Sequence, residues 1–192
     1  AKVPDGWPGS AEGTLPKGAG LGLEEGGLFG RRCARMSIPA DATKAWTGWR
    51  QDVPVLPGRT YLCSAWLKSQ DLEGGLQIHV HLCKADGSLS DHSPYTSAGP
   101  AINGTTDWTL ISGLFTMPED CRIFQVHLTM LATGTAWHDG ALVAEVQPGT
   151  PGSVETRVPP QTGGAVTVWP VNSVVKVFQD DGAPRDVPAA RV

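Results

Sequence analysis

The chain has 192 residues, a formal net charge of −4, 24 glycines and 16 prolines. A mildly acidic chain without a lysine and arginine cluster lacks the basic surface that nucleic-acid binding needs, and no apolar run approaches the roughly 20 residues that span a bilayer. Few charged residues, many turn formers and no long runs at helical spacing predict an all-β protein.

Residues 1–30 are rich in glycine and proline, so we expect them to form loops. Short strand-like runs then follow one another, separated by turn signals such as "LPGR", "KADG" and "MPED". The expected strands are 31–39, 48–55, 60–69, 76–84, 107–117, 122–131 and 134–146. This spacing predicts a β-sandwich jelly roll of two antiparallel sheets, with residues 85–106 as a long polar loop at its edge.

Composition divides the chain into three parts. Residues 1–147 are expected to form the sandwich, 148–164 a linker rich in proline and glycine, and 165–192 the start of a following β domain. The last part is too short for a core of its own, so the alternative is that it packs back on the sandwich.

The four cysteines, Cys33, Cys63, Cys83 and Cys121, have no CxxC spacing. Zinc ribbons and redox pairs are therefore disfavoured, and buried free thiols are a better interpretation than disulfides.

Alternation within three strands predicts a polar sheet face. Apolar residues occupy every second position, and the positions between them carry uncharged hydrogen-bonding or aromatic side chains. A face of this kind suits a ligand with many hydroxyl groups. Its expected members are Gln77, His79, His81, Gln125, His127 and Thr129, together with Ser64, Trp66 and Lys68 from the strand 60–69.

Seven tryptophans divide between the core and this face. Trp108 and Trp137 follow strand patterns and are expected in the core, and Trp49, next to the residues "RQDVPV", is expected to anchor the loop. Trp46 lies in a loop, so we expect it to present its indole to a ligand; Trp66 is the second candidate. The alternative for both is packing under or over a loop.

The middle of the chain resembles the carbohydrate-binding modules of families four, nine and twenty-two. The resemblance rests on four motifs in order, "DGW", "AWTGWRQDVPVLPGRTYLCSAWLKS", "TDWTLISGLFTMP" and "GTAWHDGALVAEV", and covers roughly residues 5–147. The tail "VWPVNSVVKVFQDDGAP" is similar to the opening of the sandwich domain that precedes the catalytic barrel in enzymes like glycoside hydrolase family 123.

The resemblance implies a secreted or cell-surface module, expected to be monomeric, that binds a polysaccharide or oligosaccharide on a concave sheet face and serves an attached catalytic domain. Trp46 matches a tryptophan that stacks on a sugar ring in xylan-binding relatives. A late strand of those relatives carries a Tyr-x-Glu pair that contacts sugar, and His127 and Thr129 take its place here. A structural calcium ion, with Asp139 as its side-chain ligand, is also implied.

Two alternatives remain open. The sandwich could be a structural spacer of a glycoside hydrolase that binds no sugar. The motif His79-x-His81, with His127 from another strand, could instead hold a metal in a cupin-like jelly-roll enzyme. Catalysis is not expected, because glycoside hydrolysis needs two carboxyl groups at a fixed separation and the acidic residues are expected in loops and turns.

Overall fold

The computed structural model describes residues 15–29, 31–92 and 94–146 with their side chains, and five further strands by their backbone. The described residues form strands and turns and include no helix, so none provides a helix long and apolar enough to cross a membrane. The strands are β1 (Gly9–Ala11), β2 (Gly20–Glu25), β3 (Arg32–Ile38), β4 (Thr47–Pro54), β5 (Thr60–Cys83), β6 (Tyr95–Thr116), β7 (Ile123–Val146), β8 (Ser153–Glu155), β9 (Val168–Pro170), β10 (Val174–Phe178) and β11 (Pro184–Pro188).

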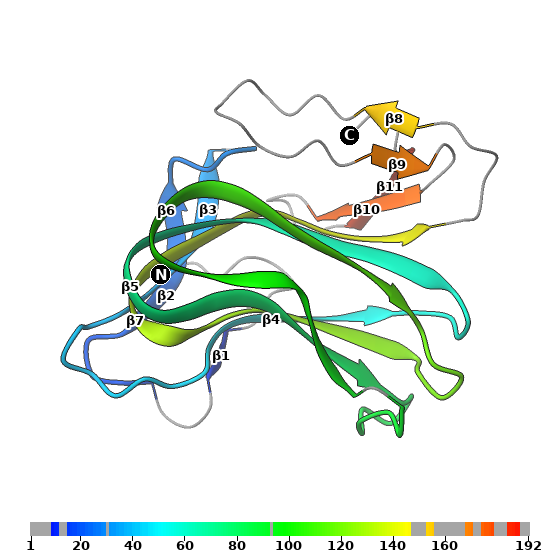
Figure 1. The fold of residues 1–192 in the computed structure, drawn as a ribbon, viewed down its shortest axis with the longest axis horizontal. Helices are drawn as coiled ribbons and strands as arrows, with labels where there is room; N and C mark the ends of the chain where they lie inside the picture. The colour runs from blue at the N-terminus through cyan, green and yellow to red at the C-terminus, as the bar shows by residue number, and fades with distance from the viewer. Residues whose placement is uncertain are drawn as a thin grey trace.

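The predicted β-sandwich is confirmed, and three long antiparallel strands form its frame (Figure 1). β5 pairs with β6 along one side and with β7 along the other. β4 adds to the first half of β7, from Thr47 opposite Met130 to Pro54 opposite Ile123. β3 adds to the second half of β7, and β2 pairs with β3.

Two of the long strands, β5 and β7, each cover two of the shorter strands expected from the sequence. β5 joins the expected strands 60–69 and 76–84 and is irregular between Gln70 and Glu73, where its register with β7 shifts. Asp71 and Gly74 there have positive φ angles of 53° and 132°. β7 runs through Gly134, at φ 106°, where a Cβ would lie 2.4 Å from the Asp71 carbonyl oxygen. Glycine therefore lets the two paired strands approach each other closely where they pass from one layer into the other.

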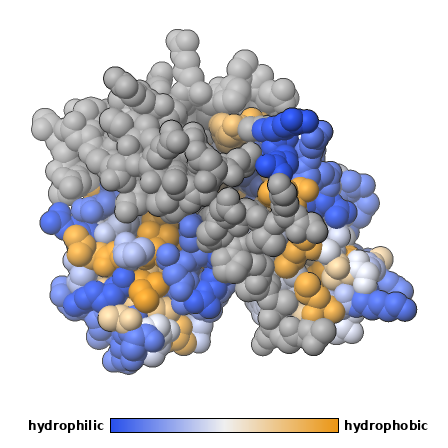
Figure 2. Space-filling model, turned by 180° about the vertical axis from the view of Figure 1, so that it is seen from behind, coloured by the Kyte–Doolittle hydropathy of each residue, from blue (hydrophilic) through white to orange (hydrophobic). Residues whose placement is uncertain are grey.

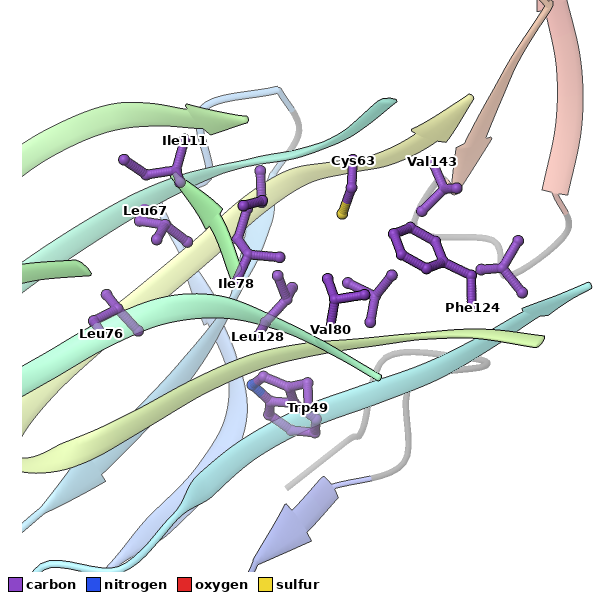
Figure 3. Packing of buried hydrophobic residues seen from close by; sticks show 14 of the residues in the cluster. Trp49, Cys63, Leu67, Leu76, Ile78, Val80, Ile111, Phe124, Leu128 and Val143 are labelled. Atoms are coloured by element: carbon purple, nitrogen blue, oxygen red, sulfur yellow. The ribbon is translucent and has the colours of Figure 1, made fainter. Parts of the chain in front are cut away.

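The core lies between the two layers. Cys63, Leu67 and Val143 project from one layer toward Val80 and Phe124 of the other (Figure 3). The first half of β5 contributes one row of the core and its second half another, because the strand bends between them. Trp49 on β4 is 1% exposed and belongs to this core, which confirms its expected anchoring role.

Three expectations about the elements are wrong. Residues 95–106 are part of β6 and not of a long loop, and residues 20–25 form β2 within the stretch expected to be loops. Trp108 and Trp137 are half-buried and lie outside the core. They flank Lys68 on an outer face, with its ammonium group 6.0 Å and 5.7 Å from the two ring centres. The charged neighbour explains how an outer position can hold tryptophan.

The four cysteines are free and buried, as expected. Burial raises the pKa of the Cys63 thiol to about 12, so this thiol stays protonated and unreactive at neutral pH.

The side of the molecule that faces away from the viewer in Figure 1 carries separate hydrophobic patches among hydrophilic residues in its described part (Figure 2).

After β7 the chain returns to the same sheet. β10 pairs with β7 from Val174 opposite Glu145 to Val177 opposite Leu142, and β11 pairs with β10. β8 and β9 form a separate two-stranded ladder. The division into sandwich, linker and following domain stays a prediction.

Candidate ligand-binding face

The candidate site is the outer face of the layer built from β6, the second half of β5, the first half of β7, and β4. Its side chains lie in cross-strand rows, because residues directly opposite each other in paired strands share a face. The first row is Ser97, His79, His127 and Arg50; the second is Tyr95, His81, Gln125 and Asp52; the third is Gln77 and Thr129.

Three imidazoles meet at the centre of this face. The ring centres of His81 and His127 are 4.4 Å apart, and those of His79 and His81 are 5.0 Å apart. The His79 and His127 ring centres are 6.4 Å apart. The sequence placed these residues on one face, and the register of β5 with β7 brings them together.

Two larger aromatic rings extend the cluster on either side of His79. The Trp46 ring lies 5.8 Å from His79 with an interplanar angle of 31°, and the Tyr95 ring lies 6.3 Å away at 19°. Trp46 is half-buried in the loop directly before β4, and Tyr95 is 56% exposed at the start of β6. Three rings of similar orientation therefore run across the face from the β4 side to the β6 side.

The histidines of this face are neutral at neutral pH. Burial lowers the pKa of His79 and His81, and His79 lowers the His81 pKa further. Burial, with His81 and Arg50 nearby, lowers the pKa of His127 to about 4. A neutral imidazole offers one N–H donor and one acceptor nitrogen, a combination that matches a hydroxyl group, which can also donate and accept.

An ion pair closes the face on the β4 side. Arg50 donates from Nε and Nη2 to the two carboxylate oxygens of Asp52, at 2.8 Å and 2.7 Å. These hydrogen bonds hold the pKa of Asp52 below its usual range. Gln125 lies within reach of both Asp52 and His81, and it is 7% exposed.

Sequence reasoning overlooked Arg50, Asp52 and Ser97. The alternation of β4, with buried Trp49 and Val53 at odd positions, carries the signal that would have placed Arg50 and Asp52 on the opposite side. The expectation that acidic residues lie only in loops and turns is therefore wrong. Asp52 is nevertheless the only carboxylate in the three rows described above, and it forms an ion pair with Arg50.

The structure does not bring Trp66 to this face. Trp66 lies on the first half of β5, opposite Asp139 of β7, and is 8% exposed with its ring against Phe29. Ser64 and Lys68 share its side of the strand, so these three residues belong to the outer face of the other layer. The bend of β5 at Asp71–Gly75 is the physical reason, because it carries the two halves of the strand into different layers.

Two other predicted ligand residues have polar atoms that are turned away from solvent. Thr129 is 6% exposed and donates its hydroxyl to the carbonyl oxygen of Thr47 at 3.0 Å. The Nε2 atom of His127 is buried, and no hydrogen-bond partner is found for it in the described part of the chain. Thr129 and His127 therefore contribute less to the surface of the face than Trp46, His79, His81 and Tyr95.

Asp139 lies away from the histidine cluster. Its carboxylate accepts hydrogen bonds from the backbone amides of Leu28, Phe29 and Gly140, the last two at 2.9 Å and 2.8 Å. These hydrogen bonds connect the turn after β2 to β7. Within residues 15–29, 31–92 and 94–146, no group of three or more His, Cys, Asp and Glu side chains is arranged to hold a metal ion. Calcium binding at Asp139 stays a prediction.

Comparison with known proteins identifies the fold class and no family. No family model matches the sequence, and no curated protein matches it. Among solved structures, the chain is similar to the xylan-binding family 22 module of Paenibacillus barcinonensis Xyn10C, with a TM-score of 0.53 and 16% identity over 72% of this chain and 86% of the module. It is also similar to a structure of the family 22 and catalytic modules of Clostridium thermocellum xylanase 10B with xylohexaose, with a TM-score of 0.55 and 16% identity.

A viral protein shares the fold as well. The enzymatically active domain of tailspike protein 4 from bacteriophage CBA120 matches 73% of this chain with a TM-score of 0.57 and 14% identity. This chain covers 19% of that domain and 28% of the xylanase structure, so it corresponds to a small part of each. The similarities establish a β-sandwich fold, which the chain shares with these carbohydrate-binding modules. None of them supports the resemblance of the tail to a family 123 hydrolase.

Proposed function

We propose that the chain is a non-catalytic carbohydrate-binding module that holds a neutral polysaccharide or oligosaccharide on the histidine face. The observation that carries the proposal is the line of three rings, Trp46, His79 and Tyr95, on an outer sheet face. A sugar ring has an apolar side of C–H groups that packs on an aromatic plane, while its hydroxyls need donors and acceptors at the margins. Neutral His79 and His81 supply both.

The charges of the face favour a neutral glycan over an acidic one. The three central histidines are uncharged at neutral pH. Arg50, the positively charged residue in the three rows, forms an ion pair with Asp52. The same arrangement disfavours hydrolysis, because a single ion-paired carboxylate offers neither the acid nor the base of a two-carboxylate mechanism.

The structural relatives lend support at the level of fold. The Paenibacillus module is a xylan-binding domain, the Clostridium structure contains xylohexaose, and both share this fold at 16% identity. We therefore propose a glycan as the ligand class and leave the sugar open. We further propose a secreted or cell-surface, monomeric module attached to a glycan-degrading catalytic domain, with a calcium ion, if bound, serving stability at Asp139.

A glycan-array screen of the purified chain, followed by titration calorimetry with the best ligand, tests the proposal. Stacking on Trp46 that removes about 100 Å² of apolar surface is worth about 2.5 kcal/mol, of which ordering losses leave about 1–2 kcal/mol. Trp46→Ala should therefore weaken binding by about tenfold or more. We expect only a small change in melting temperature, because Trp46 lies outside the core.

Trp137→Ala is the matched control. Trp137 is also a half-buried tryptophan on an outer sheet face, but it lies on the other layer beside Lys68. Its removal should leave glycan affinity unchanged. A chain that binds no glycan on the array, or a Trp46→Ala variant with wild-type affinity, would contradict the proposal and favour a structural spacer.

A further inference from the structure

Gln125 occupies a central position in the second row of the histidine face. It lies on β7, directly opposite His81 of β5 on one side and directly opposite Asp52 of β4 on the other. Residues opposed in this way have Cβ atoms about 5 Å apart, so the amide group of Gln125 is within reach of both neighbours. Gln125 is 7% exposed, and a buried amide needs hydrogen-bond partners. His81 and Asp52 are the two polar neighbours that the row offers it.

The charge of Asp52 decides which way the amide of Gln125 points. Arg50 donates to both carboxylate oxygens of Asp52, which keeps this carboxyl group ionised and its pKa below the usual range. An ionised carboxylate accepts hydrogen bonds and has no hydrogen to donate. Gln125 therefore directs its NH₂ group toward Asp52 and its carbonyl oxygen Oε1 toward His81.

The orientation of Gln125 in turn selects one tautomer of His81. Oε1 of Gln125 is an acceptor, so the ring nitrogen of His81 on that side must carry a hydrogen. His81 is neutral at neutral pH, because burial and His79 lower its pKa. A neutral imidazole carries one ring hydrogen, so the second ring nitrogen of His81 has a free lone pair and is an acceptor.

His127, whose ring is closest to that of His81, does not take the place of Gln125. The two ring centres are 4.4 Å apart, but the buried Nε2 atom of His127 has no hydrogen-bond partner among the described residues. Hydrogen bonding with Gln125, in contrast, affects both of its neighbours. It lowers the pKa of Asp52 in addition to the larger effect of Arg50, and it raises the pKa of His81 against the larger effect of burial. The amide of Gln125 therefore reaches both side chains.

We propose that Gln125 is a positioning residue that fixes the tautomer of His81, so that the histidine face presents an acceptor nitrogen to its ligand. The hydrogen bonds run from Arg50 through Asp52 and Gln125 to His81, and each residue determines the donor or acceptor role of the next. His81 is half-buried, and its second nitrogen is the one that does not face Gln125. The consequence for binding rests on the proposed function: at this position the face selects a sugar hydroxyl, which can donate, over an O-methyl group, which cannot.

Nitrogen-15 NMR of the imidazole rings in the full chain tests the proposal without any ligand. Long-range correlation spectra distinguish a ring nitrogen that carries hydrogen from one that does not, and replacing each of the five histidines in turn assigns the signals. At pH 7.5 we expect His81 to show one nitrogen of each kind. Gln125→Met, which keeps the side-chain length and removes both polar atoms, should give the averaged signals of two exchanging tautomers and a lower His81 pKa. Gln77→Met, a change in the third row, is the matched control and should leave the His81 signals unchanged.

Asp52→Asn tests the origin of the orientation. An asparagine amide donates as well as accepts, so it no longer fixes the direction of Gln125, and His81 should lose its single tautomer as in Gln125→Met. The Asp52 side chain is 43% exposed, so this variant should fold, and its result alone decides if Gln125→Met does not fold. Mixed tautomers of His81 in the wild-type chain would overturn the proposal. A single tautomer that persists in every folded variant of Asp52 and Gln125 would also overturn it.

The consequence for binding is measured with the neutral oligosaccharide that binds most tightly on the glycan array and with its single-O-methyl derivatives. In the wild-type chain the derivative methylated at the hydroxyl that faces His81 should bind about tenfold more weakly than the parent oligosaccharide. Gln125→Met should bind the parent within about twofold of wild type, because about half of its His81 rings still present the acceptor nitrogen. It should bind that derivative better than wild type does, since the other tautomer donates to the ether oxygen.

Two outcomes of the binding measurement separate this inference from the proposed function. Equal discrimination among the derivatives by wild type and Gln125→Met would overturn the selection of a hydroxyl by His81 and leave glycan binding standing. Absence of any bound oligosaccharide would contradict the proposed function, and the NMR spectra would then decide the tautomer by themselves.

Discussion

The buried histidine of β7 should make the fold sensitive to acid. His138 is 2% exposed in the described structure, opposite Leu67 of the core, and neither ring nitrogen has a hydrogen-bond partner among the described residues. Burial lowers the pKa of His138 from 6.5 to about 3. The unfolded chain therefore takes up a proton on this side chain at a pH where the folded protein does not.

The sign of the effect follows from this difference. Above pH 6.5 the imidazole is neutral in both the folded and the unfolded state, so its protonation does not change the free energy of unfolding. As pH falls from 6.5 toward 3, the unfolded state gains protons and the free energy of unfolding decreases by about 1.4 kcal/mol per pH unit. At pH 4.5, two units below the unfolded pKa, the loss due to His138 is about 3 kcal/mol.

His138→Leu should remove this loss. Urea denaturation of wild type and variant at pH 8 and pH 4.5 gives the four free energies of unfolding. At pH 8 the variant should be as stable as wild type or more stable, because two unpartnered buried nitrogens are gone. At pH 4.5 its advantage should grow by about 3 kcal/mol.

An exposed histidine provides the control. The side chain of His92 is 72% exposed, and His92→Asn should change stability by no more than about 0.5 kcal/mol at pH 8. If the advantage of His138→Leu grew by less than about 1 kcal/mol between the two pH values, the imidazole would be hydrated or hydrogen-bonded in the folded protein and the argument from burial would fail.

Two further predictions concern the frame of the sandwich. Trp49→Ala should lower the free energy of unfolding by about 3–5 kcal/mol, because Trp49 is 1% exposed in the core; a loss below about 1 kcal/mol in urea denaturation would show that the core closes around the gap. Gly134→Ala should lower the melting temperature strongly, because φ is 106° and the new Cβ would lie 2.4 Å from the Asp71 carbonyl oxygen. Gly87→Ala is its control for positive φ without crowding, since nothing lies within 4 Å of a Cβ there. Calorimetry should therefore give a lower melting temperature for Gly134→Ala than for Gly87→Ala, and equal melting temperatures would contradict the argument.

Alternation in the sequence determined which side of each strand faces the core. The alternate positions expected to face the core in residues 60–68, 76–83 and 122–131 all belong to the core cluster, since a strand places successive side chains on opposite faces whatever its partner. The same rule put His79, His81 and His127 on polar positions. These properties depend on local geometry and burial, which a single strand already encodes.

Only the tertiary structure decided which polar positions meet. Trp66 and His79 both lie on the polar side of β5, but the bend at Asp71–Gly75 sends them to opposite layers. Tyr95, by contrast, is brought beside His79 by the pairing of β6 with β5. Alternation fixes a side chain's face within its own strand. Strand pairing, and the close approach of β5 and β7 that Gly74 and Gly134 permit, fix which faces become one surface.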